Sequence, residues 1–438
     1  MDLAAWLRLK DLEYKDNVLH SGQNSLASLA DKYGTPLYVT NEDVIRKRYQ
    51  ALKLSLGKVV ESYHIHYSVK ANASLAILKI LNQEQAYIDV VSPGEIFLCL
   101  RAGFPPERIL YTGNNFTNEE LRYALEKGVM LNLDDGSQID RLTSICTKFG
   151  MKKPLLSFRV NPEFGAGHHE HTITAGKNVK FGILDEQVVD VYTKAKNAGF
   201  QHFGVQMHIG SGILEIPPFE LAAGKYIRIV ENIAAKVGIT FEFIDFGGGI
   251  SIPYRLEEGP LNLNAYAQTL TAPFKTLVAK GKVGKPVFCI EPGRYLSSEA
   301  TQLVVQINTI KKTPYKTFVG TNGGFNVLIR PTMYGSFHTI LPVVQREGAP
   351  ITCDVVGQIC ESGDVIGRDR ELKGVLEGDY LAILDTGAYG YAMASEYNSR
   401  PLPAEVLIHG KTVDVVRERQ SFEDLLRHQR IPPHLESK

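Results

Sequence analysis

Between about residues 41 and 300, eight short apolar runs rich in β-forming residues alternate with runs of helical period. The expected strands are His64–Val69, Tyr87–Val91, Arg108–Tyr111, Val129–Leu133, Leu155–Val160, Phe203–His208, Phe241–Phe246 and Val287–Ile290. The helix patterns include Leu75–Asn82, Gly94–Ala102, Asn118–Glu126, Asp185–Asn197 and Phe219–Val237, with a weaker one at Asn41–Leu56. Eight strands joined by helical crossovers predict a closed (β/α)8 TIM barrel; an open doubly wound sheet is the alternative.

After about residue 300 the pattern changes to β-rich runs separated by Gly/Pro turns, with few helices between them. The expected strands are Gln302–Ile310, Thr339–Gln345, Ile351–Val356, Tyr380–Leu384, Ala404–Ile408 and Thr412–Val416. This pattern predicts an antiparallel β domain. The first 40 residues, with a short strand at Pro36–Val39, are expected to complete it. We therefore expect an α/β protein with a barrel at 41–300 and a β domain at 1–40 and 301–438.

Composition narrows the class of protein. The chain has 438 residues, more than one compact domain usually holds, and 48 basic residues balance 48 acidic ones. No lysine or arginine run indicates nucleic-acid or anionic-membrane binding. The five cysteines, an odd count with no CxxC pair, argue against a disulfide framework and a zinc site and favour a reducing compartment. With no signal-peptide pattern and no apolar stretch of about 18 residues, the expectation is a cytoplasmic protein without a membrane partner.

All eight expected barrel strands end in a polar side chain or a glycine. In chain order these positions are Lys70, Ser92, Gly113, Asn132, Arg159, His208, Gly247–Gly249 and Glu291. Catalytic residues of barrel enzymes gather at the carboxyl ends of the strands. The pattern therefore predicts both the barrel and a site at this end of it.

Lys70 is the first of these residues. Side chains alternate along the preceding strand, so His64, His66, Ser68 and Lys70 are expected to share one face. A buried lysine loses its proton readily and becomes the amine nucleophile needed for a Schiff base with a carbonyl cofactor. Taken by itself, a lysine at this position is more often a solvated lysine at a strand end than a nucleophile.

Several of the later strand ends carry groups that suit a phosphorylated aromatic ligand. Consecutive backbone amides in Gly247–Gly249 can form a phosphate nest, and Ser211 adds a hydroxyl one strand earlier. The His208 imidazole could face a planar ring. The alternatives are an ordinary glycine turn and a satisfied core histidine.

The last strand end combines a carboxylate and a guanidinium, in Glu291-Pro292-Gly293-Arg294. A carboxylate beside a pyridine nitrogen keeps that nitrogen protonated and makes the ring an electron sink. Arginine recognises phosphate or carboxylate through paired hydrogen bonds. The alternative for this segment is a salt-bridged turn.

Three segments of the second region also stand out. They are Arg330–Tyr334, Cys360-Glu361-Ser362-Gly363-Asp364, and Asp385–Gly390 with Tyr389. An isolated cysteine is usually an inert small apolar residue, but acidic neighbours in a Gly/Ser loop make Cys360 a candidate proton donor.

The stretch 165–171, which contains three histidines, resembles a metal cluster. No carboxylate-rich partner segment accompanies it, and its glycines are typical of a loop. We therefore expect no metal there.

Taken together, these motifs resemble the fold-type III pyridoxal-phosphate-dependent decarboxylases, and most closely the diaminopimelate decarboxylase family. The resemblance runs from Thr35-Pro36-Leu37-Tyr38 to Asn398-Ser399-Arg400-Pro401. Related ornithine and arginine decarboxylases share the motifs Ser68–Asn72 and Glu291–Arg294. The more selective motifs are Arg159–Pro162 with Gly165–His169 and Lys180–Gly182, Cys360–Asp364, and Tyr397–Pro401.

The resemblance implies a role for each candidate residue. Lys70 would be the Schiff-base lysine, His208 would stack on the cofactor ring, and Glu291 would hold the pyridine nitrogen protonated. The implied phosphate-binding residues are Ser211, Gly248, Gly249, Gly293 and Tyr389. The implied substrate-binding residues are Arg294, Arg330, Tyr334, Tyr389 and, at the distal end of the substrate, Glu361. Cys360, Glu361 and Tyr389 would cross to the barrel of a neighbouring subunit, so the active unit would be a homodimer.

The implied activity is decarboxylation of meso-2,6-diaminopimelate to L-lysine and carbon dioxide, the last step of lysine biosynthesis, with pyridoxal 5'-phosphate as cofactor. A decarboxylase of another basic or carrier-bound amino acid, such as ornithine or arginine, is an alternative. A non-catalytic homologue that binds the cofactor is another. Alanine racemase shares the architecture but has no need of the Cys360–Asp364 motif.

Overall fold

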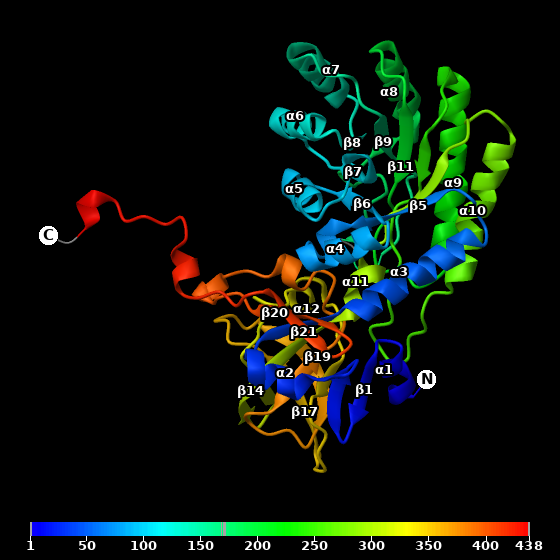
Figure 1. The fold of residues 1–438 in the computed structure, drawn as a ribbon. Coiled ribbons are helices and arrows are strands. Elements are labelled where there is room, and N and C mark those ends of the chain that lie inside the picture. Colours follow the sequence, from blue (N-terminus) through cyan, green and yellow to red (C-terminus); the bar gives the residue numbers. More distant parts are fainter. Residues whose placement is uncertain (1, 168, 170–171, 437–438) are drawn as a thin grey trace. The chain divides into compact units, whose positions relative to one another are not determined.

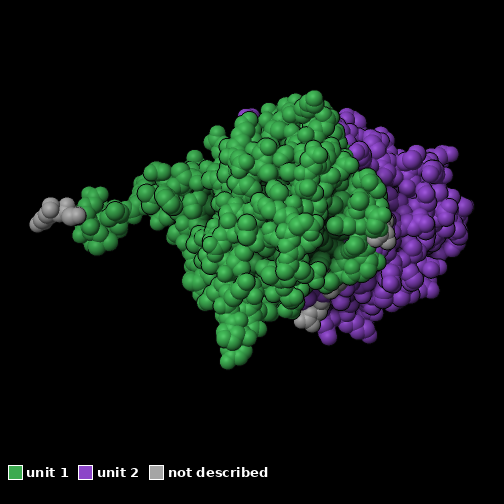
Figure 2. Space-filling view, turned by 90° about the horizontal axis from the view of Figure 1, so that it is seen from below, with its two compact units in different colours: residues 1–44, 254–257, 298–438 green, residues 45–253, 258–297 purple. Residues whose placement is uncertain are grey.

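A computed structural model describes residues 2–167, 169 and 172–436. The chain divides into two compact units, coloured separately in Figure 2. Unit 1 consists of Met1–Val44, Tyr254–Glu257 and Ser298–Lys438, and unit 2 consists of Ile45–Pro253 and Glu258–Ser297. Within the described ranges, no helix is both long and apolar enough to cross a bilayer.

Unit 2 is built on eight parallel strands that close into a ring. They are β5 (Tyr63–Ser68), β6 (Tyr87–Val90), β7 (Ile109–Thr112), β8 (Met130–Leu133), β9 (Leu156–Asn161), β11 (Phe203–Met207), β12 (Phe243–Asp245) and β13 (Val287–Ile290). Each strand pairs in parallel with the next, and β13 pairs with β5 to complete the ring. A two-residue strand, β10 (Ile183–Leu184), adds to β9 outside the ring. The prediction of a (β/α)8 barrel is confirmed, and the open doubly wound sheet is excluded.

Helices occupy the crossovers between the barrel strands (Figure 1). They are α4 (Leu75–Gln83), α5 (Pro93–Arg101), α6 (Asn118–Lys127), α7 (Gln138–Phe149), α8 (Asp185–Asn197), α9 (Pro217–Ile233) and α10 (Leu263–Ala279), and α3 (Glu42–Gly57) precedes the first barrel strand. Local sequence sets several helix starts: the Ser92 side chain accepts a hydrogen bond from the amide of Glu95 at the start of α5. This cap fixes where α5 begins after β6, and so it places the short loop between them.

Unit 1 is a β domain with three short helices. Its strands are β1 (Leu12–Lys15), β2 (Val18–Ser21), β3 (Asn24–Ser25), β4 (Leu37–Asn41), β14 (Thr301–Lys312), β15 (Thr317–Thr321), β16 (Ile340–Pro342), β17 (Pro350–Val356), β18 (Val365–Lys373), β19 (Tyr380–Ile383), β20 (Ala404–His409) and β21 (Thr412–Arg417). Its helices are α1 (Leu3–Arg8), α2 (Leu26–Tyr33) and α12 (Arg330–Tyr334). The central strand β14 pairs with β4, so the N-terminal segment completes the domain as expected.

Unit 1 contains an antiparallel sheet of β1, β2 and β3 and a nine-stranded sheet that is mixed, which corrects the expectation of an antiparallel domain. Most neighbours run antiparallel, but β4 pairs in parallel with β20, and β15 in parallel with β17. A parallel pair requires a long crossover between its strands. Both pairs have one, because β4 and β20 come from opposite ends of the chain, and α12 and β16 intervene between β15 and β17.

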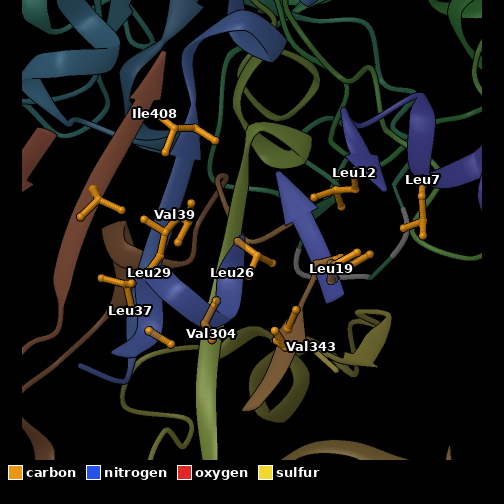
Figure 3. Close-up of a cluster of buried hydrophobic side chains, with 14 of the residues drawn as sticks. Leu7, Leu12, Leu19, Leu26, Leu29, Leu37, Val39, Val304, Val343 and Ile408 are labelled. Carbon is orange, nitrogen blue, oxygen red and sulfur yellow. The ribbon is translucent and has the colours of Figure 1, made fainter. Parts of the chain in front are cut away.

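The N-terminal segment is held in unit 1 by apolar packing. Figure 3 shows Leu7, Leu12 and Leu19 in one cluster with Val304 and Val343, all almost fully buried. Burying an aliphatic side chain of this size stabilises a fold by about 1.5–3 kcal/mol. Residues more than 280 positions apart therefore share one core, and the first residues of the chain are an integral part of the β domain.

Candidate active site

The carboxyl ends of the barrel strands carry a buried polar layer, of which Glu291 is the central member. Glu291 follows β13, is 4% exposed, and accepts a hydrogen bond at Oε2 from Gln206 Nε2 at 2.8 Å. Its Oε1 is buried and accepts no hydrogen bond from the described residues. Burial, together with the nearby carboxylates of Asp245 and Asp89, raises the pKa of Glu291 well above its ordinary value. One oxygen is therefore fixed by the protein and the other can accept from a ligand donor.

Lys70 lies in a short 3-10 turn, Val69–Ala71, immediately after β5. Its Nζ is 2.7 Å from Asp89 Oδ2; the Lys70 side chain is 35% exposed, whereas that of Asp89 is fully buried. The amine thus lies at the rim rather than deep in the barrel. Sequence reasoning missed Asp89, although its place one residue before the end of the second barrel strand was a usable signal.

The His208 ring is oriented by the glycine segment. The backbone amide of Gly248 donates to His208 Nδ1 at 3.1 Å, so the proton of a neutral ring resides on Nε2. Burial, with the charges of Arg159 and Lys70, lowers the pKa of His208 well below its ordinary value. His208 therefore presents a neutral imidazole with its proton on Nε2.

The glycine segment forms a close-fitting loop beside Glu291. Gly247 has φ +70°, and a Cβ on Gly248 would lie 2.3 Å from the carbonyl oxygen of Glu291. A side chain at Gly248 would therefore displace the backbone that carries the carboxylate. Arg294 donates from Nε and Nη2 to Ser211 Oγ, at 3.3 and 3.0 Å. Amides, a hydroxyl and a guanidinium are thus available to an anionic group.

These residues fit pyridoxal phosphate as a set. Lys70 offers an amine, Glu291 a buried oxygen with no partner among the described residues, and the glycine loop a cradle that excludes side chains. Each matches a different part of the cofactor: the aldehyde, the pyridine nitrogen and the phosphate. The barrel residues picked out from sequence are therefore brought to the same end of the barrel.

Arg330, in unit 1, is buried and hydrogen-bonded within that unit. It is 1% exposed and donates to Tyr254 Oη at 3.2 Å and to His338 Nε2 at 2.8 Å. His338 Nδ1 lies 2.8 Å from the carbonyl oxygen of Leu384, which fixes Nε2 as the acceptor for the guanidinium. Tyr334, at the other end of α12, is half-buried.

Cys360 and Glu361 lie in an exposed loop of unit 1. The amide of Cys360 donates to Asn398 Oδ1 at 3.1 Å, and Tyr397 Oη donates to Glu361 Oε1. The buried Asp364 carboxylate closes the loop by accepting from the amides of Ile359 and Phe325. The structure therefore brings the Cys360–Asp364 motif and the Tyr397–Pro401 motif together.

Tyr389 is a half-buried residue of unit 1 with φ +61°, a left-handed conformation uncommon for a tyrosine. In the histidine-containing stretch 165–171, His168, Glu170 and His171 lie outside the described residues.

Comparison with known proteins decides the family. Residues 42–298 match the model of the pyridoxal-dependent decarboxylase family, pyridoxal binding domain. Diaminopimelate decarboxylase of Methanothermobacter thermautotrophicus is 47% identical over 428 residues, which covers 97% of this chain and 99% of that protein. The chain belongs to the diaminopimelate decarboxylase family. The diaminopimelate decarboxylase of Aquifex aeolicus is 36% identical over 94% of this chain and 96% of that protein.

Solved structures agree with this placement. Diaminopimelate decarboxylase from M. jannaschii superposes with a TM-score of 0.91 at 33% identity, covering 98% of this chain and all of that one. The same enzyme in co-complex with L-lysine gives a TM-score of 0.90. A Paramecium bursaria Chlorella virus arginine decarboxylase, at 18% identity and a TM-score of 0.75, shares the fold.

Proposed function

We propose that this chain decarboxylates meso-2,6-diaminopimelate at its D-configured centre, giving L-lysine and carbon dioxide. The observation that carries the proposal is the convergence of Lys70, Glu291 and the glycine loop at one end of the barrel. Family membership supports it, as do the L-lysine complexes of two related enzymes.

Different barrel residues would contact different parts of the cofactor. Lys70 would bind its aldehyde carbon, and Glu291 would keep its ring nitrogen protonated through Oε1, while Gln206 fixes Oε2. His208 would lie against the ring face, and Ser211, Gly248, Gly249, Gly293 and Arg294 would hold the phosphate, with Tyr389 from unit 1. When bound, pyridoxal phosphate accepts the electron pair that remains on the substrate α-carbon as carbon dioxide leaves.

Residues of unit 1, together with Arg294 of unit 2, would act on the substrate. Arg330, Tyr334, Arg294 and Tyr389 would bind it, and Glu361 would contact its distal end. Cys360, or Lys70 once released, would return a proton to the α-carbon. The place of Cys360 in an exposed loop supports a role at a subunit boundary. The guanidinium of Arg330, placed near the distal end of the substrate, would suit a substrate with a second carboxylate better than it would suit ornithine.

The proposed active unit is a cytoplasmic homodimer in which Cys360, Glu361 and Tyr389 serve the neighbouring barrel. All five cysteines are unpaired, which agrees with a reducing compartment. Mixing the inactive variants Lys70→Ala and Cys360→Ala should partly restore activity, because hybrid dimers then contain one intact site. Two inactive variants that give no activity after mixing and reassociation would contradict shared sites.

Substrate choice is tested by offering meso-diaminopimelate, ornithine and arginine side by side and identifying the products by mass spectrometry. The proposal predicts lysine as the main product and no turnover by Lys70→Ala. Putrescine or agmatine as the main product would favour the alternative decarboxylases. Purified protein that holds the cofactor but releases no carbon dioxide from any of the three would favour the non-catalytic homologue.

A further inference from the structure

A group of side chains able to coordinate a metal ion lies on the two strands that close the barrel. His64 and His66 belong to β5 and Cys289 to β13, and one potential ligand atom from each lies within 4.8 Å of the other two. His64 and Cys289 are opposed in the β13–β5 pairing. These are the last and first strands of the ring, so the group spans the seam at which the barrel closes.

This group lies inside the barrel, on the strands themselves rather than beyond their carboxyl ends. Cys289 is fully buried and packs with Leu110 from β7 and Phe243 from β12. These three strands are not all neighbours in the ring, so their side chains meet across its interior. His64 is the second residue of β5, whereas the proposed cofactor site lies beyond the carboxyl ends. The two sites are therefore distinct.

His66 is the observation that points to a ligand. It is 1% exposed, and neither of its ring nitrogens has a hydrogen-bond partner among the described residues. A buried polar group without a partner costs about 1–3 kcal/mol. The ring stacks on Tyr87, with centroids 5.3 Å apart, and Tyr87 stacks in turn on His64. Packing holds both imidazoles in place without satisfying the nitrogens of His66.

The residue types of the group suit a metal ion. A histidine coordinates through the lone pair of a ring nitrogen, and a cysteine coordinates as a thiolate after losing its proton. Both ring nitrogens of His66 are without a partner among the described residues, so either one can face an ion.

We propose that His64, His66 and Cys289 bind a zinc ion that joins the two strands at the closing seam of the barrel. Two neutral imidazoles and one thiolate are borderline-soft ligands of the kind zinc prefers, and a water molecule completes four-coordination. In a tetrahedral site the ligand atoms lie about 3.6 Å apart, so the three ligand atoms, now within 4.8 Å of one another, must move closer together as the ion binds. Two Zn–N bonds and one Zn–S bond form, the S–H bond breaks, and its proton passes to solvent. This site is independent of the proposed decarboxylation.

The experiment measures zinc in the purified holoenzyme after stripping with a chelator, incubation with zinc chloride and desalting. Elemental analysis should find about one zinc per wild-type chain. Zinc should fall to background in His66→Phe, which keeps a ring against Tyr87, and in Cys289→Ala. The controls His202→Ala and His169→Ala, which alter histidines elsewhere, should retain the wild-type zinc content.

Zinc bound to the wild type should also raise its melting temperature, because an ion that binds only the folded state stabilises it. If His66→Phe fails to fold, His64→Phe at the half-buried position replaces it, with folding checked by bound cofactor. A wild-type chain without zinc would overturn the proposal. So would zinc that survives in Cys289→Ala, or that is lost in His169→Ala.

Discussion

At the scale of single residues, the site depends on how one buried carboxylate is divided between two partners. Gln206 donates to Oε2 of Glu291, and Oε1, which has no partner among the described residues, is left for the proposed contact with the cofactor nitrogen. Lys70, Glu291 and His208 were candidates from sequence because polar residues end apolar strands. Gln206 was not, because a polar residue inside a strand does not show which distant side chain it meets. Asp89 was missed although it lies next to the end of its strand. Gln206 is 85 positions from Glu291 in the chain.

Replacing Glu291 with glutamine tests the role of the carboxylate. An amide cannot keep a pyridine nitrogen protonated, so kcat for decarboxylation should fall by at least about 100-fold while the cofactor remains bound. Steady-state kinetics and the cofactor absorbance measure the two effects separately. Glu242→Gln, at an exposed ion pair with His202, is the matched control and should behave as wild type. Turnover by Glu291→Gln within tenfold of wild type would exclude the assigned role.

The buried carboxyl of Asp245 gives the cofactor-free protein a pH dependence. Burial raises its pKa from 3.8 to about 8, so the folded chain holds this proton more tightly than the unfolded chain does. Stability from this group is therefore full at low pH and is lost as pH rises from about 4 towards about 8. Asp245→Asn keeps an oxygen for the Gly247 amide and removes the titration. The melting temperature of the variant minus that of wild type should be larger at pH 8 than at pH 5. The same difference at both pH values would contradict the raised pKa of Asp245.

At the scale of helices and strands, elements with buried, regular patterns were predictable and exposed ones were not. The barrel strands are buried on both faces and read as continuous apolar runs. In unit 1, β18 escaped prediction because its exposed middle, Arg368-Asp369-Arg370, reads as a loop. β15 escaped because it is short and contains Gly320. Parallel pairing of β4 with β20 could not be predicted, since local sequence carries no information on partners at the other end of the chain.

The start of α6 offers a test at this scale. Thr117 Oγ1 accepts from the amide of Glu120 at 3.1 Å, and the Glu120 side chain accepts from the amide of Thr117 at 2.8 Å. Thr117→Ala removes half of this capping box and should lower the free energy of unfolding of the barrel by about 1 kcal/mol. Urea denaturation measures the loss, and kcat should remain unchanged. A stability equal to wild type would show that the box does not contribute.

At the scale of the whole molecule, distant parts of the chain are joined within unit 1 by a buried ion cluster. Lys10 Nζ lies 3.0 Å from Glu299 Oε1 and 2.8 Å from Asp385 Oδ1, and all three side chains are at most 1% exposed. The ammonium also lies 4.2 Å from the centroid of the Trp6 ring. The cluster ties the N-terminal segment to two later parts of the β domain, which no local sequence pattern reveals.

Lys10→Met leaves two buried carboxylates without their cation and should destabilise the β domain by about 3–5 kcal/mol. Lys15→Met, at an exposed pair with Glu13, should cost less than about 1 kcal/mol. Equilibrium unfolding of both variants measures the contrast. Equal stabilities for the two would mean that the cluster does not hold the N-terminal segment in place.

The account as a whole rests on Lys70 as the residue that holds pyridoxal phosphate. Its most direct test is to reduce the purified holoenzyme with borohydride, digest it, and locate the cofactor mass by tandem mass spectrometry. The account predicts that the cofactor is found on the peptide containing Ser68-Val69-Lys70, attached to Lys70. Cofactor attached to another lysine, or a Lys70→Ala variant that still carries it covalently, would contradict the central claim.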